Sequence, residues 1–253
     1  MPHYSDSESV LKKAVKRDAI EKAGEDMPYR ILLIDCDNTI LDFTTAERNA
    51  IAKTFADFGI PCNEEILNIY HKYNIKHWEL LESREETRKQ CLENRFAETF
   101  AEIGAEADPE KVNRSYEIYL SQGHWFMPGA EETLALLNGK YDMYLISNGN
   151  LFVQEGRFKS SGITKYFKGV FVSEAVGADK PSPEFFEAVI SSIPDWNREE
   201  VLVIGDSLTS DIKGGNNIGA DTLWYDPEGK PLKEGYKVNY TVSSWDELWE
   251  ILK

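Results

Sequence analysis

The segment from Arg30 to Thr39 most constrains what this chain can fold into. Its apolar run, Ile31 to Ile34, is typical of a buried strand and leads into two aspartates, Asp35 and Asp37. A buried carboxylate must be paired or bound to a cation. In open α/β sheets, ligands bind at the carboxyl ends of the strands. The segment therefore predicts a metal-assisted site for an anion, although an aspartate in this place can also serve only as a helix cap.

The composition limits the partners that such a site can have. The 253 residues are 42% hydrophobic, which is enough for one large domain or for a core with a smaller lobe. Acidic residues number 44 against 28 basic ones, giving a net charge of −16. This charge repels nucleic acid and anionic membranes, so we expect neither as a partner. No apolar stretch approaches the length that spans a membrane.

The cysteines and the start of the chain bear on location. The three cysteines show no metal-ligand spacing and cannot all pair within one chain, and they are Cys36, Cys62 and Cys91. A reduced, cytoplasmic location is therefore expected. Residues 1–27 have no apolar signal core and show apolar side chains at helical spacing before Gly24. We expect an N-terminal extension, helical or mobile, to which the sequence assigns no function.

After residue 28 the pattern indicates an α/β fold with a doubly wound, mostly parallel, Rossmann-like sheet. The predicted strands are Ile31 to Asp35, Tyr141 to Ser147, Gly169 to Ser173, Val201 to Asp206, Thr222 to Tyr225 and Val238 to Val242. The predicted helices between and after them are Ala130 to Leu137, Leu151 to Ser160, Pro183 to Ser192, Asp211 to Ile218 and Ser244 to Leu252.

Residues 44–123 interrupt this alternation. They contain no convincing strand, and their helical windows are separated by Gly59 to Pro61, by Ser83 and by Gly104 to Pro109. Three or four helices inserted after the first strand would form a separate lobe above the carboxyl edge of the sheet, where it could act as a lid. The predicted division is a catalytic core of residues 28–43 and 124–253 and a helical cap of residues 44–123.

Three further motifs also follow strands or lie in the adjoining loops. Ser147 and Asn148 end the second strand and could form an anion-binding turn, or only a helix cap. Lys180 precedes two prolines that make its loop rigid. Asp206 ends the predicted strand Val201 to Asp206 and suits a hard cation such as Mg²⁺. Asp211 follows as an orienting group or a helix cap.

Together these motifs resemble the haloacid dehalogenase superfamily of phosphohydrolases, in the branch with a helical cap after the first strand. The resemblance lies in DCDNTILDF at residues 35–43, ISNGN at residues 146–150, Lys180, and GDSLTSDIKGG at residues 205–215. This wording most resembles the house-cleaning pyrimidine 5′-nucleotidases. Phosphoglycolate and small sugar-phosphate phosphatases share the same chemistry and remain the alternative reading.

The resemblance implies roles for the acidic residues. Asp35 would attack phosphorus and form an aspartyl-phosphate, and Asp37 would serve as general acid and then as general base. Mg²⁺ would be held by Asp35, by the backbone carbonyl of Asp37 and by Asp206. Asp211 would orient these ligands without binding the ion. True dehalogenases lack an aspartate at position 37, so Asp37 favours phosphate ester hydrolysis.

The resemblance also implies the groups that bind the phosphate. Thr39, Ser147, Asn148 and Lys180 would contact the phosphoryl oxygens. A binding protein without turnover is a third reading. The joint presence of Asp35, Asp37, Ser147, Lys180 and Asp206 counts against it.

Specificity must come from the insert, since the core would treat every phosphoryl group alike. Aromatic and imidazole side chains gather in two short stretches, Tyr70 to Trp78 and His124 to Phe126. A nucleobase could stack on them, but aromatic residues on helices more often pack in a core. Phe43, at the mouth of the insert, is the specificity residue that we select. The sequence leaves oligomeric state open.

Overall fold

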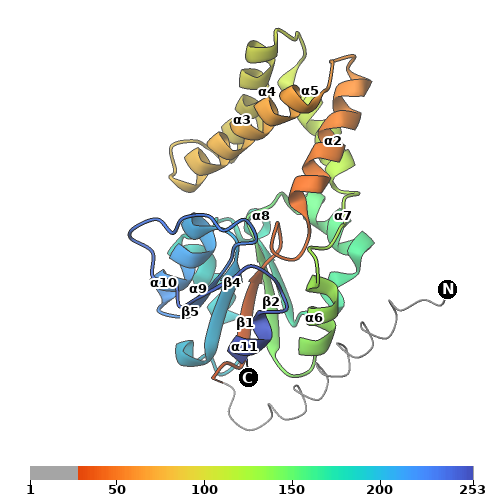
Figure 1. The fold of residues 1–253 in the computed structure, drawn as a ribbon. Coiled ribbons are helices and arrows are strands. Elements are labelled where there is room, and N and C mark those ends of the chain that lie inside the picture. The colour runs from red at the N-terminus through yellow and green to blue at the C-terminus, as the bar shows by residue number, and fades with distance from the viewer. Residues whose placement is uncertain (1–27, 253) are drawn as a thin grey trace, which may run out of the picture.

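The computed structural model describes residues 28–252, so the expected helix in residues 1–27 lies outside the described residues. Their centre is a six-stranded parallel sheet of order β3-β2-β1-β4-β5-β6, with helices on both faces (Figure 1). The strands are β1 (Ile31–Asp35), β2 (Asp142–Ser147), β3 (Gly169–Val172), β4 (Val201–Gly205), β5 (Asp221–Tyr225) and β6 (Tyr240–Val242). The predicted doubly wound parallel sheet is confirmed.

Helices of the core cover the two faces of this sheet. They are α6 (Ala130–Leu137), α7 (Leu151–Ser161), α8 (Ser173–Val176), α9 (Pro183–Ser191), α10 (Lys213–Ile218) and α11 (Leu248–Leu252). Short turns are η1 (Ile163–Tyr166), η2 (Arg198–Glu200) and the π-helical η3 (Leu208–Ile212).

Two of the predicted helices were placed wrongly at their starts. The helix expected from Asp211 is divided into η3 and α10. The final helix begins at Leu248 rather than Ser244, and Trp245 instead packs into the core before the helix starts. The four residues of α8 were not predicted, because so short a helix shows no periodicity in the sequence.

The alternation of side chains along β1 explains why the strand is apolar throughout. Leu32 and Ile34 pack with α6 and the C-terminal segment, whereas Ile31 and Leu33 pack with α9. Successive side chains of a strand point to opposite faces, so a sheet covered on both sides needs apolar residues at every position. This leaves the ends of the strands as the places where polar residues can be accommodated.

The insert forms four helices, which we call the helical lobe: α2 (Phe43–Asp57), α3 (Glu64–Glu82), α4 (Arg88–Ile103) and α5 (Pro109–Leu120). They lie above the carboxyl edge of the sheet (Figure 1). Residues 44–123, all of which are described, contain no strand. The breakers work as expected: Gly104 ends α4 with φ of 69°, and Pro109 begins α5. The lobe has its own aromatic core, which includes Tyr70, Phe96 and Tyr116.

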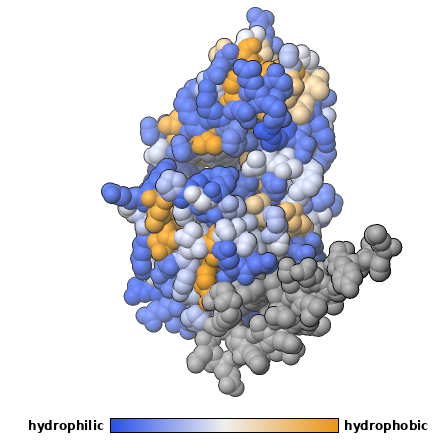
Figure 2. Space-filling model, viewed as in Figure 1, coloured by the Kyte–Doolittle hydropathy of each residue, from blue (hydrophilic) through white to orange (hydrophobic). Residues whose placement is uncertain are grey.

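The surface agrees with the acidic, polar composition. Figure 2 shows a face that is mostly hydrophilic, with apolar residues at scattered places. Among the described residues, no helix combines the length and the apolarity needed to cross a bilayer. All three cysteines are free thiols; Cys36 and Cys91 are buried and Cys62 is exposed.

We expect Phe96→Ala to lower the free energy of unfolding by about 3–5 kcal/mol, because it empties a fully buried site between two tyrosines. Urea unfolding measures this loss. The matched control is Phe152→Ala, whose ring is 54% exposed and whose removal should cost less than about 0.5 kcal/mol. Equal losses would mean that the aromatic cluster does not stabilise the lobe.

Candidate active site

A cavity of about 840 Å³ lies between the carboxyl edge of the sheet and the helical lobe. Its floor includes Asp35 at the end of β1, Asn148 after β2 and Asp206 after β4. In the strand order, β1 is followed by β2 toward one edge of the sheet, and β4 is followed by β5 toward the opposite edge. Ligands of open α/β sheets bind at such a switch point between two strands. The fold thus brings together motifs that lie more than a hundred residues apart.

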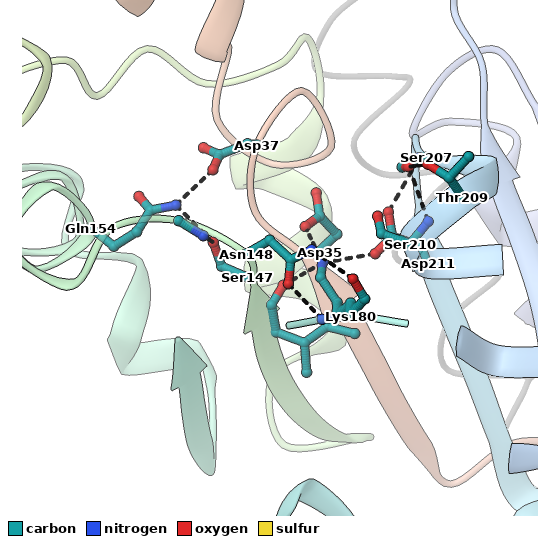
Figure 3. Close-up of polar contacts among 12 residues, drawn as sticks. Asp35, Asp37, Ser147, Asn148, Gln154, Lys180, Ser207, Thr209, Ser210 and Asp211 are labelled. Atoms are coloured by element: carbon teal, nitrogen blue, oxygen red, sulfur yellow. Dashed lines mark hydrogen bonds and ion pairs between the residues drawn. The ribbon is translucent and has the colours of Figure 1, made fainter. Parts of the chain in front are cut away.

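Lys180 is the centre of the polar cluster on this floor (Figure 3). Its Nζ donates to Oδ1 of Asp35 at 2.6 Å and to Oδ1 of Asp211 at 2.8 Å. A third bond of 3.2 Å reaches the carbonyl of Ile146. All three donors of the ammonium are used, and the residue is only 1% exposed. Lys180, which was predicted only because the other motifs accompany it in the sequence, is therefore a buried cation with all its hydrogen bonds made.

The loop that carries Lys180 is tied to the loop after β2. Asn148 accepts from the Lys180 backbone amide at 2.7 Å and donates to the Lys180 carbonyl at 2.9 Å. Both polar groups of the Asn148 side chain are thus occupied by Lys180. The side chain positions the lysine, and its predicted contact with phosphate gains no support from this geometry.

Ser147 and Thr39 are both almost completely buried. The Ser147 hydroxyl accepts from the Gly149 amide at 3.0 Å and from Gln154 at 2.8 Å. Thr39 is fully buried and does not line the cavity, and its carbonyl accepts from the Trp245 indole at 2.8 Å. Thr39 therefore fixes the loop after β1 against the core, away from the cavity.

Three carboxylates converge next to the lysine. Oxygens of Asp35, Asp206 and Asp211 all lie within 4.8 Å of one another. Asp211 also accepts from the Ser207 amide at 3.2 Å, so each of its oxygens has a partner. Gly205 makes room for it, since a Cβ at this position would lie 2.2 Å from an Asp211 oxygen. Glycine before Asp206 is thus a requirement of packing.

The charges of the cluster favour the binding of a cation beside the three carboxylates. Burial raises the pKa of Asp35 to about 7 despite the lowering effect of Lys180, and burial together with the neighbouring carboxylates raises the pKa of Asp206. Burial acts to lower the pKa of Lys180, but Asp211 and Asp35 raise it. Three carboxylates and one ammonium leave two negative charges uncompensated. An oxygen-only set with this excess charge fits a hard divalent cation such as Mg²⁺.

Asp37 also lines the cavity and is held by two residues that the sequence analysis missed. Gln154 Nε2 donates to its Oδ2 at 2.6 Å, and the fully buried Arg157 forms an ion pair with its Oδ1 (Figure 3 shows Gln154). Both come from α7, three residues apart. The only signal in the sequence was a glutamine and an arginine in the helix directly after Ser147. Asn38 adopts φ of 59°, a left-handed conformation that asparagine tolerates in a tight turn.

The helical lobe also contributes residues to the cavity. Phe43 lines it, with the Arg157 guanidinium 5.6 Å from its ring centre. Glu82 of α3 accepts from the Thr209 hydroxyl at 2.7 Å, between the two acidic residues of the β4 loop. Arg88 of α4 donates to the Ser173 hydroxyl at 2.7 Å and pairs with Asp179, next to Lys180. Glu82 and Arg88 were not predicted, because charged residues at helix ends normally face solvent.

A family model described as haloacid dehalogenase-like hydrolase matches residues 29–219. The chain belongs to the haloacid dehalogenase-like hydrolases. The resemblance seen in the motifs is thereby confirmed, and the match covers the acidic β1 loop, the helical lobe and the β4 loop.

Similar proteins include several members of this hydrolase family. HAD-hydrolase YfnB of Bacillus subtilis is 38% identical over 88% of this chain and 95% of that protein. Pyrimidine 5′-nucleotidase PynA of Streptococcus pneumoniae is 35% identical, covering 89% and 96%. Pyrimidine 5′-nucleotidase YjjG of Escherichia coli is 29% identical, covering 89% and 99%. A crystal structure of YfnB bound to magnesium superposes with a TM-score of 0.86 and covers 89% of this chain and 99% of that one.

Glu82→Gln should flatten the dependence of stability on pH in this haloacid dehalogenase-like hydrolase. Burial raises the pKa of Glu82 to about 7, although the Thr209 hydroxyl opposes the rise. The folded state therefore binds a proton that the unfolded chain releases near pH 4.5, and stability is lost as pH rises through 7. Between pH 5 and pH 8 the wild type should lose on the order of 2 kcal/mol relative to the variant.

Urea unfolding in metal-free buffer at both pH values measures this difference. Glu65→Gln removes one charge from an exposed position on the same helix, away from the cavity, and is the control for net charge. Parallel pH profiles for the wild type and Glu82→Gln would contradict the buried, protonated state of Glu82.

Proposed function

We propose that this protein is a Mg²⁺-dependent phosphomonoesterase that acts through an aspartyl-phosphate and prefers pyrimidine nucleoside 5′-monophosphates. The observation that carries the proposal is the pairing of Asp35 with the buried Lys180 beside two further carboxylates. The preference for nucleotides is supported by relatives named pyrimidine 5′-nucleotidases that are 35% and 29% identical.

Asp35 is the proposed nucleophile. One of its oxygens forms a bond to phosphorus while the bond between phosphorus and the ester oxygen breaks. A carboxylate that approaches a phosphate dianion to about 4 Å meets roughly 8 kcal/mol of repulsion at an effective dielectric constant near 20. The Nζ of Lys180 lies 2.6 Å from Oδ1 of Asp35, and its positive charge offsets part of this repulsion.

Asp37 is the proposed general acid and base. It donates a proton to the departing ester oxygen, and later accepts a proton from the water that attacks phosphorus and releases phosphate from Asp35. Its contacts with Gln154 and Arg157 keep its carboxylate facing the cavity at a fixed place. Position rather than flexibility is what such proton transfer requires.

Asp35, Asp206 and the backbone carbonyl of Asp37 are the groups that would hold Mg²⁺. When bound, the ion supplies positive charge that offsets the repulsion between nucleophile and phosphate. Both oxygens of Asp211 already accept hydrogen bonds, so this residue serves better as a positioning group. The magnesium-bound structure of YfnB supports the proposal.

Lys180 and Ser147 remain the proposed phosphate ligands. Lys180 lines the cavity, and a phosphate would take the place of one of the three hydrogen-bond partners of its ammonium. Ser147 is 1% exposed and does not line the cavity, so its role depends on an opening of the loop after β2. The contacts of Asn148 with the Lys180 backbone and the burial of Thr39 favour structural parts for these two residues. Residues 44–123 are proposed as a cap that closes over the substrate. A cavity of about 840 Å³ favours a nucleotide over phosphoglycolate, since pockets of this size bury ligands far larger than a two-carbon acid.

A phosphate-release screen at saturating Mg²⁺ tests the substrate class. We expect the highest kcat/KM for pyrimidine monophosphates such as UMP, dUMP or dTMP, with purine nucleotides, phosphoglycolate and hexose phosphates lower. Asp35→Asn is the control, and it should release no phosphate from any substrate while keeping the fold. A clear preference for phosphoglycolate or a sugar phosphate would refute the nucleotidase while leaving the phosphatase mechanism intact.

Magnesium should stabilise the folded protein without substrate, because it binds carboxylates that exist as a cluster only in the native state. We expect the rise in Tm on adding Mg²⁺ to vanish in Asp206→Asn and to persist, though reduced, in Asp211→Asn. Thermal melts across a Mg²⁺ titration measure both. The opposite order of the two variants would exchange their proposed roles.

A further inference from the structure

One face of helix α3 lines the cavity along about three turns. Its residues recur at helical spacing, and they are His71, Asn74, Ile75, Trp78, Glu79 and Glu82. Glu82 contacts Thr209 of the β4 loop, so this end of the face lies beside the catalytic carboxylates. Each earlier turn of the helix lies about 5.4 Å farther from them. The face is therefore placed to contact the part of a substrate that lies beyond its phosphate.

Trp78 is one turn along this face from Glu82, and its half-buried ring is held from two sides. The indole Nε1 donates to Oδ1 of Asn74 at 3.1 Å. The guanidinium of Arg88 lies 5.6 Å from the ring centre, and Arg88 is itself bonded to Ser173 and Asp179 of the core. The ring is thus fixed in place by both the lobe and the core.

Asn74 owes its orientation to a buried polar chain inside the lobe. Its Nδ2 donates to Glu47 at 2.6 Å, and its Oδ1 accepts from Arg95 at 2.8 Å as well as from Trp78. Glu47, Asn74 and Arg95 are all nearly inaccessible to solvent. These bonds settle which end of the amide faces the indole, so Trp78 is preorganised before any ligand binds.

We propose that Trp78 is the surface on which the base of the nucleotide stacks. The inference rests on the proposed function and identifies the residue that selects a nucleotide over a base-free phosphate. An indole offers a wide aromatic face, and stacking on such a face stabilises bound bases.

Other aromatic residues of the lobe are less suited. Tyr70 is buried in the aromatic core, and the hydroxyl of Tyr73 donates to Glu102 with Lys72 over the ring. Phe43 faces Arg157 beside Asp37, at the catalytic end of the cavity. Trp78 thereby replaces Phe43 as the residue to test first for recognition of the base.

The test compares UMP with ribose 5-phosphate, which has the same phosphate and sugar but no base. In Trp78→Ala, kcat/KM for UMP should fall about tenfold to a hundredfold while that for ribose 5-phosphate stays nearly constant. Trp78→Phe, which keeps an aromatic face, should retain most of the preference. Tyr73→Ala is the matched control, an aromatic residue on the same helix that does not line the cavity.

An unchanged ratio between the two substrates in Trp78→Ala would overturn the inference, whether both activities persist or both fall by the same factor. If Trp78→Ala does not fold, Trp78→Leu decides in the same way, because it keeps apolar bulk without the aromatic face. Failure of the proposed function is separate and is measured on the wild type alone. A wild type that hydrolyses UMP no better than ribose 5-phosphate refutes the nucleotidase, whatever the variants do.

Discussion

The buried ammonium of Lys180 is the interaction on which the rest of the site depends. It joins β1 through Asp35, β2 through the Ile146 carbonyl and the β4 loop through Asp211. Buried carboxylates so close together would repel one another strongly, and one cation bonded to two of them makes their approach possible. The reciprocal bonds between Asn148 and the Lys180 backbone then set where that cation lies. The proposed nucleophile, the proposed metal-binding carboxylates and the loops after β2 and β4 thus share one anchor.

An acidic protein can handle an anion when its cations are concentrated where the anion binds. The net charge is −16, yet two of the cavity's cations, Lys180 and Arg157, are almost completely buried. Charges removed from water act over a lower effective dielectric constant than the many carboxylates on the surface, which solvent and salt screen. The local field at the floor of the cavity is therefore set by few groups. The charge of the whole chain instead governs which large partners it repels.

The proposed function assigns chemistry to the core and recognition to the helical lobe, and a few contacts couple the two. Glu82 bonds to the β4 loop, and Arg88 bonds to the segment just before Lys180. The same Arg88 lies against the ring of Trp78. A change in the position of the lobe would therefore alter both the shape of the cavity and the surroundings of Lys180. Such coupling is a physical route by which binding of a remote part of the substrate can favour the reaction at phosphorus.

The sequence by itself determined the α/β class, the six strands and the acidic groups at their ends, because buried strands must be apolar and their carboxyl ends are where polar groups can gather. It also indicated Lys180, through motifs in register rather than through any local pattern. Only the tertiary structure showed that Gln154 and Arg157 hold Asp37, and that Trp78 lines the cavity whereas Tyr70 and Tyr73 do not. A polar or aromatic residue on a helix has the same local signature whether it faces solvent, a core or a ligand. Which of these surroundings it has depends on how helices distant in the sequence pack against one another. The helical periodicity of 3.6 residues shows only which residues share a face of one helix, and not what that face contacts.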